Sequence, residues 1–201
     1  NSVVHSTTYY YRLAATNSGN GSATAFSLAT TNAATAEVTA AFDFYTSPVQ
    51  AGFVNANPSA TSGGVSVNVT GSYIARSRSI GASHELDNLM KDVYLLSSSV
   101  MVTLSGLDTS RSYLVTLYSH DADSYDGGVT AWTWGGNTIA TITNSVADYE
   151  SLPSYATGLT YSDAGGSIVL TGTKVSGFYG MLNGLVVEVG PPPGGSLFLF
   201  R

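Results

Sequence analysis

The stretch "SVMVTLSGLDTSRSYLVTLYSH", residues 99–120, decides the fold. In its first half Val100, Val102 and Leu104 recur at every second position, opposite Met101 and a threonine. Successive side chains of a β-strand point to opposite faces, so this alternation predicts a strand with one buried face. A short polar segment then separates it from a second apolar run. The stretch therefore predicts two strands joined by a turn.

The same kind of run returns along the chain, separated by turn residues at short and fairly regular spacing. Such spacing is typical of a β-sandwich or barrel. The further predicted strands are "VTAAFDF" (38–44), "GVSVNVTG" (64–71), "YIARSRSI" (73–80), "VTAWTWGG" (129–136), "NTIATITN" (137–144), "GSIVLTG" (166–172) and "MLNGLVVEV" (181–189). One segment departs from the pattern. In "SHELDNLMKDVYLL" (83–96) apolar residues fall at helical spacing after Ser83, a plausible N-cap, which predicts a short helix across one end of the sandwich.

Composition limits the classes of partner. Charged residues make up only 10% of the 201-residue chain, against roughly 25% in average soluble domains. The net charge is −6 without any basic cluster, which argues against nucleic acid and anionic membranes as partners. No apolar run approaches the ~20 residues of a membrane span. The absence of cysteine excludes disulfides and thiolate metal sites.

Both ends of the chain carry apolar strands outside the main run of strands. Residues 9–31 predict a β-hairpin around the turn "NSGNGS", and "GPPPGG" (190–195) interrupts regular structure before a terminal apolar strand. We therefore divide the chain into an N-terminal hairpin (1–32), a main domain (33–190) and a Pro/Gly spacer with a last strand (191–201). An isolated hairpin is marginal in water, so these apolar strands need a covering surface.

Two resemblances follow from these motifs. The hairpin sequence "TTYYYRLAATNSGNGSAT" resembles the last two strands of a fibronectin type III domain. Residues 41–189, with "FDFYTSPVQAGF", "VTLSGLDTSRSYLVTLYSHDADSY" and "YGMLNGLVVEV", resemble a galactose-binding-like jelly roll of secreted bacterial proteins. The tail "GPPPGGSLFLF" is similar to the start of a PEP-CTERM sorting signal, but it lacks the Glu between the prolines, the full membrane segment and the basic cluster.

These resemblances imply a fold and a location. The expected fold is all-β: an antiparallel jelly-roll β-sandwich with one short helix, an N-terminal hairpin and a C-terminal apolar strand. The expected protein is bacterial and is extracellular or exposed at the cell surface, and carbohydrate binding is common in such jelly rolls. Asn20 and Asn68 begin sequons that would allow glycosylation in a secreted protein.

The loop "SHDADSYDGG" (119–128) is a candidate metal site. Asp121, Asp123 and Asp126 would supply several of the six to eight oxygen ligands that Ca²⁺ takes. The alternative is an exposed acidic turn held by side-chain bonds of its own aspartates. Ca²⁺ is therefore the one cofactor that the sequence suggests.

Alternating aromatic and basic residues give candidate carbohydrate contacts. Trp132 and Trp134 lie at the same face of one predicted strand and could stack on sugar rings, or they could belong to the core. Arg76 and Arg78 could clamp an anionic sugar, or they could keep an edge strand soluble. We find no nucleophile elbow, and in "SHELD" the second His of a zinc-protease motif is missing. The sequence thus favours a non-catalytic protein.

The terminal strands suggest self-assembly. Their apolar side chains could add to a sheet of another copy, a head-to-tail contact that propagates into a homopolymer. The residues predicted to make that contact are Tyr9, Tyr11, Leu13, Phe26, Leu28, Leu197, Phe198, Leu199 and Phe200. The first hypothesis is therefore a structural subunit of a surface assembly or pilus-like filament. The alternative is a carbohydrate-binding module of a secreted multidomain enzyme that acts on polysaccharide.

Overall fold

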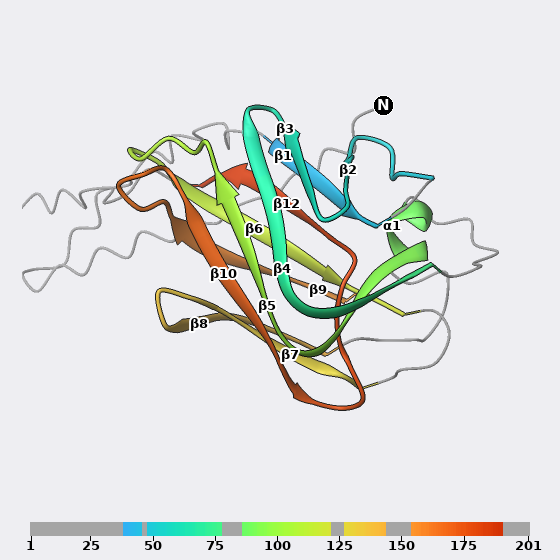
Figure 1. Cartoon of the computed structure of the whole chain (residues 1–201). Helices are drawn as coiled ribbons and strands as arrows, with labels where there is room; N and C mark the ends of the chain where they lie inside the picture. The colour runs from blue at the N-terminus through green and yellow to red at the C-terminus, as the bar shows by residue number, and fades with distance from the viewer. Residues whose placement is uncertain (1–37, 46–47, 78–85, 122–126, 144–153, 191–201) are drawn as a thin grey trace, which may run out of the picture.

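The computed structural model describes residues 38–45, 48–77, 86–121, 127–143 and 154–190 as a two-layer β-sandwich (Figure 1). The predicted N-terminal hairpin and C-terminal strand lie outside these residues. The elements are β1 (Val38–Phe44), β2 (Val54–Ala56), β3 (Ser59–Ser62), β4 (Val65–Ser77), α1 (Asp87–Lys91), β5 (Asp92–Ser105), β6 (Ser112–Ser119), β7 (Val129–Trp134), β8 (Asn137–Thr143), β9 (Ser154–Tyr161), β10 (Ile168–Ser176), β11 (Gly180–Leu182) and β12 (Gly184–Val189). The prediction of an all-β sandwich with one short helix is confirmed.

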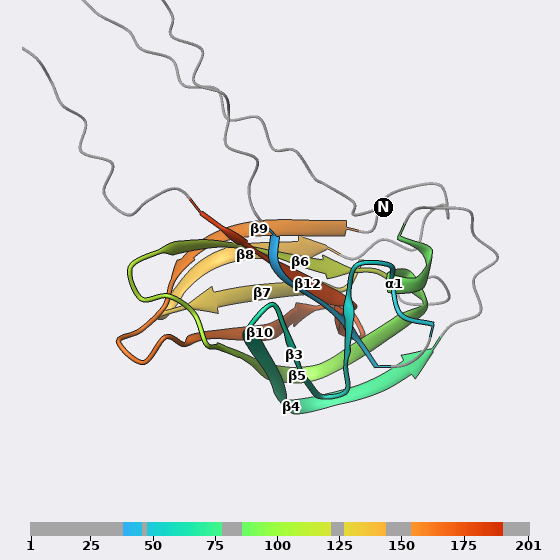
Figure 2. The same cartoon turned by 90° about the horizontal axis from the view of Figure 1, so that it is seen from above.

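Two sheets form the layers, and Figure 2 shows them facing one another. The first sheet has the order β2-β1-β12-β6-β9, and the second has the order β3-β4-β5-β10-β7-β8, with β11 paired to β5. Neighbouring strands are antiparallel except β1 and β2, which pair in parallel. The order places strands from both ends of the sequence side by side, as β1 beside β12 illustrates.

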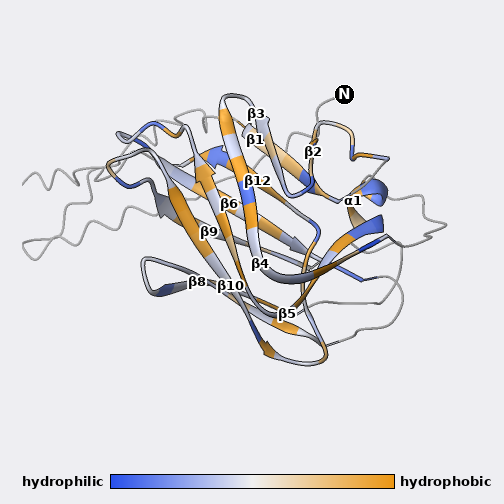
Figure 3. Cartoon of the chain, in the orientation of Figure 1, coloured by the Kyte–Doolittle hydropathy of each residue, from blue (hydrophilic) through white to orange (hydrophobic). Residues whose placement is uncertain are grey.

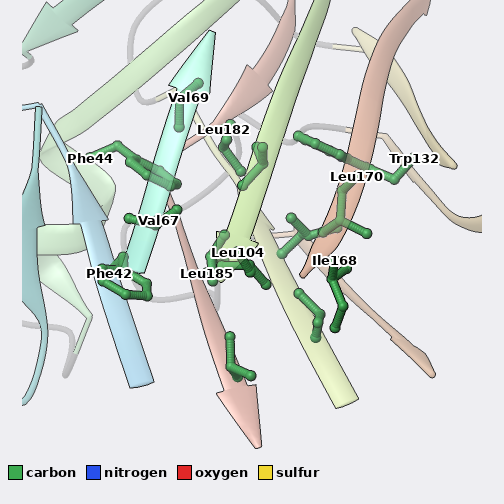
Figure 4. Packing of buried hydrophobic residues seen from close by; sticks show 14 of the residues in the cluster. Phe42, Phe44, Val67, Val69, Leu104, Trp132, Ile168, Leu170, Leu182 and Leu185 are labelled. Carbon is green, nitrogen blue, oxygen red and sulfur yellow. The ribbon is translucent and has the colours of Figure 1, made fainter. Parts of the chain in front are cut away.

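The core between the sheets is built from the alternation seen in the sequence. Val100, Val102 and Leu104 of β5 are buried, whereas Met101 between them is exposed. Figure 4 shows side chains of both sheets converging, including Phe42 of the first sheet. Burying each such side chain contributes roughly 1.5–3 kcal/mol. The alternation in the opening stretch therefore separates the core face from the outer face, as predicted.

Several elements differ from the sequence prediction. The helix is shorter, because α1 covers only Asp87–Lys91 and Val93 already belongs to β5, where it is buried. The two strands predicted at 64–71 and 73–80 form one strand, β4, with a bulge after Gly71. Gly71 has φ +121°, and a Cβ there would meet the backbone of β5. A conformation that only glycine adopts readily thus carries the strand through a position that the sequence suggested as a turn.

The edges of the two sheets approach one another in pairs. β2 leads directly into β3, and β8 contacts β9 on the other side of the sandwich. There the side chain of Ile139 lies against Gly158, where a Cβ would come within 3.0 Å of it.

Within the described residues no helix is long and apolar enough to cross a membrane.

Candidate binding site

The end of the sandwich that carries α1, called the α1 end below, gathers the ends of strands from both sheets (Figure 1). At this end Asp43 of β1 pairs with Gly184 of β12, which also pairs with Tyr118 of β6. In the second sheet the last residue of β4 pairs with Asp92, the first residue of β5. Polar residues at these strand ends are therefore brought together from four distant parts of the sequence.

Asn183, which lies between β11 and β12, ties these strand ends to one another. Its side chain is fully buried; Oδ1 accepts a hydrogen bond from the backbone N–H of His120 at 2.6 Å, and Nδ2 donates to the carbonyl of Asp92 at 2.7 Å. Its backbone N–H donates to Tyr118, and its carbonyl accepts from the N–H of Phe44. The side chain and the backbone of one residue thus hold β1, β5 and β6 in place across both sheets.

Asp43 has a buried carboxyl group, and only one of its two oxygens is hydrogen-bonded among the described residues. Its Oδ2 accepts a hydrogen bond of 2.7 Å from the backbone N–H of Gln50, whose Oε1 in turn accepts one from the N–H of Leu89 in α1. Oδ1 is buried and has no hydrogen-bond partner among the described residues. Burial raises the pKa of Asp43 to about 7; the Gln50 N–H opposes this shift and the nearby charge of Asp92 adds to it.

A second group of polar side chains follows at the end of β6. Ser119, His120 and Asp121 are all buried. The Oγ of Ser119 and both ring nitrogens of His120 have no hydrogen-bond partner among the described residues. Burial lowers the pKa of His120, although the charge of Asp121 opposes the shift, so the imidazole is neutral near pH 7.

These groups form what we call the end cluster: Asp43, Gln50, Asp92, Ser119, His120, Asp121 and Asn183. In the described part of the chain, four of the six buried side-chain atoms without a partner belong to it. The other two are Nε1 of Trp132 and Oε1 of Glu188, a residue that has other interactions. Most buried polar groups in proteins are satisfied, so a concentration of unsatisfied ones at one end needs an explanation such as a ligand.

An exposed aromatic residue lies beside the end cluster. Tyr155 near the start of β9 is 55% exposed and pairs with Tyr118, whose ring lies 6.1 Å from its own. Tyr118, on the adjacent strand, packs in a small apolar cluster with Leu89 of α1 and Val186 of β12. The helix therefore packs on the outer face of the first sheet, which is the face from which Tyr155 projects.

The chemistry of this end suits recognition of hydroxyl groups. Carboxylates accept hydrogen bonds, while a neutral imidazole and a serine hydroxyl both donate and accept. Ser119 and His120 make no hydrogen bond to one another in the described structure, so a paired nucleophile and base is not assembled there. Within the described residues no group of three or more His, Asp or Glu is arranged to hold a metal ion.

The two tryptophans do not form the exposed platform that the sequence suggested. Trp132 is fully buried, and its ring covers Gly172 so closely that a Cβ there would lie 2.6 Å from it. Trp134 is partly buried against the core, and its ring contacts Tyr161 at 5.8 Å. The strand face shared by the pair is the inner face, so the alternative reading as core residues fits Trp132.

The structure separates the other predicted site residues. Arg76 is exposed near the end of β4, Asn68 is exposed in the same strand, and Asp121 is buried in the end cluster. Asp121 thus becomes part of a site through its neighbours in space, while its role as a Ca²⁺ ligand stays a prediction. The predicted residues that lie outside the described part of the chain are Arg78, Asp123, Asp126, Asn20, Tyr9, Tyr11, Leu13, Phe26, Leu28, Leu197, Phe198, Leu199 and Phe200.

Comparison with known proteins shows the fold and not the family. No protein-family model matches the sequence, and no curated protein matches it. The plant receptor-like kinase ANX2 is similar with a TM-score of 0.54 and 15% identity, over 77% of this chain and 48% of that one. The extracellular domain of ANXUR1 from Arabidopsis thaliana gives 0.53 and 15%, over 77% and 49%. A complex of the plant peptide RALF23 with FER and LLG2 gives 0.50 and 13%, over 76% and 40%. This chain thus spans about half or less of the similar chains.

Proposed function

We propose that this chain is a non-catalytic, extracellular carbohydrate-binding module whose ligand is recognised at the α1 end. The observation that carries the proposal is the end cluster, which gathers unpartnered acceptor and donor atoms of Asp43, Ser119 and His120 at one end of the sandwich. Jelly rolls recur among lectins, and loops at the end of a β-sandwich commonly bind ligands. The low charge content and the similarity of fold to an extracellular domain support an extracellular location.

Tyr155 is the residue that we assign to direct contact with the sugar. An exposed aromatic ring supplies a large apolar surface at little cost in conformational entropy, and sugar rings present apolar C–H faces to such a surface. The ring of Tyr118 on the adjacent strand contacts it and helps to orient it. The end cluster then supports the neighbouring strand ends and offers hydrogen bonds to sugar hydroxyls.

The filament hypothesis receives no support from the described residues. It rests on apolar strands in residues 1–32 and 191–201, which lie outside them. Strand addition needs an open sheet edge, whereas β8 and β9 lie against one another at Ile139 and Gly158, and β2 leads directly into β3. Carbohydrate binding is therefore the better supported function.

The test is retention of the full chain on a panel of immobilised galactan, mannan, xylan and β-glucan, measured by affinity electrophoresis. We expect retention on at least one polysaccharide, and Tyr155→Ala should weaken it at least tenfold. Tyr161→Ala is the matched control, because Tyr161 lies on the same strand at the opposite end and contacts Trp134. Equal losses in both variants, or no retention on any polysaccharide, would contradict the proposal.

A further inference from the structure

The outer face of the second sheet carries few charged side chains. In β3, β4, β5, β7, β8, β10 and β11 the charged residues are Arg76, Asp92 and Lys174, and all three lie towards the α1 end of their strands. Asp92 is buried in the end cluster. The outward side chains between them are mainly serine and threonine. Figure 3 shows β5 and β10 alternating along their middle parts between apolar orange and the pale colour of weakly polar residues. The middle of this face therefore carries no charge.

Apolar side chains interrupt the hydroxyls near the centre of the face. Met101 of β5 and Val169 of β10 are 46% and 41% exposed. Met101 pairs with Thr171, and Val169 pairs with Thr103, so the two apolar side chains are diagonal neighbours on adjacent strands. Two exposed apolar groups thus lie together on the two central strands of the six-strand order.

Several hydroxyls on this sheet already satisfy one another. Ser99 and Thr173 are 3.3 Å apart between their hydroxyl oxygens, and in the β3–β4 hairpin Thr61 and Ser66 are 2.8 Å apart. A hydroxyl that keeps a hydrogen bond inside its own sheet loses less when water is removed from it. This face can therefore be covered by a partner at a lower cost than an ordinary polar surface.

The size of the face matches a protein interface. Six strands at about 4.8 Å spacing are roughly 25 Å across, and they hold between 4 and 14 residues, so roughly nine residues on average at about 3.3 Å each give a length of roughly 30 Å. The product is roughly 750 Å², and a stable interface buries about 800 Å² per partner. The cores of such interfaces are depleted in charged residues, as this face is.

We propose that this face stacks on the same face of a second copy, which makes a closed, twofold-symmetric dimer. The chain has a net charge of −6, so two copies repel one another, and an uncharged face is where they approach at the lowest electrostatic cost. The outer face of the first sheet is unsuited to this role, because α1 packs on it. A twofold contact uses one patch on both copies and ends at two, unlike a head-to-tail filament.

Sedimentation velocity of the full chain tests the proposal. We expect a dimer, and Thr173→Arg should raise its dissociation constant at least tenfold, because each dimer then buries two opposed arginines near its centre. Thr157→Arg is the matched control, since Thr157 is an exposed strand threonine on the first sheet. A chain that is monomeric at every concentration overturns the proposal, and so does a dimer that only Thr157→Arg disrupts.

A second measurement does not depend on whether the arginine variant folds. The chain has no cysteine, so Met101→Cys and Thr157→Cys each place a single spin label. Stacked sheets lie about 10 Å apart, so the label at Met101 should show strong dipolar coupling between copies, while the label at Thr157 should show weaker coupling. The reverse pattern overturns the proposal. Loss of polysaccharide retention in Thr173→Arg, in a chain that is monomeric throughout, would instead assign this face to the glycan.

Discussion

Polar side chains are hydrogen-bonded differently at the two ends of the sandwich. At the end away from α1, Asp108 and Asp163 stand in turns between strands, and each accepts hydrogen bonds within its own turn, from Ser110 in one and from Gly165 and Ser167 in the other. At the α1 end the polar side chains reach across the two sheets, and several atoms have no partner among the described residues. Hydrogen bonds within a turn stabilise that turn, whereas polar atoms without a partner are available to a ligand in a binding site.

The pKa values of the aspartates also differ between the two ends. Hydrogen bonds from Ser110 lower the pKa of Asp108, and Arg111, 3.4 Å away, adds to the shift. Burial has the opposite effect on Asp43, whose pKa rises to about 7. An exposed carboxylate in a turn is therefore stabilised as an anion, whereas the carboxylate of the end cluster holds a proton up to neutral pH.

The largest expected effect is at Asn183. Asn183→Ala removes two side-chain hydrogen bonds and leaves the N–H of His120 and the carbonyl of Asp92 buried without their partner. We expect a loss of about 3 kcal/mol in the free energy of unfolding, since each unsatisfied buried group costs roughly 1–3 kcal/mol. Urea unfolding followed by tyrosine and tryptophan fluorescence measures it.

Asn137→Ala provides the control, because Asn137 is exposed in the β7–β8 hairpin. It should change stability by less than about 0.5 kcal/mol. Similar losses in the two variants would show that Asn183 does not hold the strand ends together.

The sequence predicted the strands better than it predicted the end cluster. The alternation around Val102 predicted the sheets, because a period of two is a local property of the chain. The strands that it missed include β2 and β3, which have three and four residues and are too short to show a period, and it predicted β11 and β12 as one strand. Helical spacing of apolar residues also extended the predicted helix as far as Val93, although Val93 pairs with Arg76 of β4 in the structure.

The end cluster could not be found from the sequence for a related reason. Asp43, Asp92, His120 and Asn183 are far apart along the chain, and only the order of the strands brings them together. One local signal was available, since Asn183 interrupts the apolar run "MLNGLVVEV" next to a glycine. A polar residue in a buried run either ends a strand or serves a network, and Asn183 does both.

A second prediction concerns pH and Asp43. Because its pKa is raised in the folded state from 3.8 to about 7, the folded protein holds a proton that the unfolded chain releases, so this group lowers stability as pH rises from about 4 to about 7. Asp43→Asn should remove that dependence and stabilise the protein above pH 7 by about 2 kcal/mol, roughly half of the full linkage because buried sites relax. Thermal unfolding between pH 4 and 8 measures the change.

His120 changes the stability with pH in the opposite direction, and this effect should remain in the Asp43→Asn variant. Its lowered pKa means that the unfolded chain binds a proton below about pH 6.5 that the folded protein does not, so stability falls with acid. Asp43→Asn should therefore keep the decline at low pH and lose the decline towards neutrality. An unchanged profile on both sides would mean that Asp43 is ionised in the folded protein.

The smallest expected effect is at the opposite end, in the turn of Asp163. Its Oδ1 accepts hydrogen bonds from the N–H groups of Gly165 at 2.8 Å and Ser167 at 2.9 Å, and the side chain is exposed. Asp163→Ala should cost about 1 kcal/mol, because water replaces the lost acceptor, and it should leave polysaccharide retention unchanged. Asp163→Asn keeps an acceptor oxygen and should recover most of that stability. If Asp163→Ala weakened retention as strongly as Tyr155→Ala, ligand recognition would not be confined to the α1 end, and the contrast between the two ends would no longer locate the site.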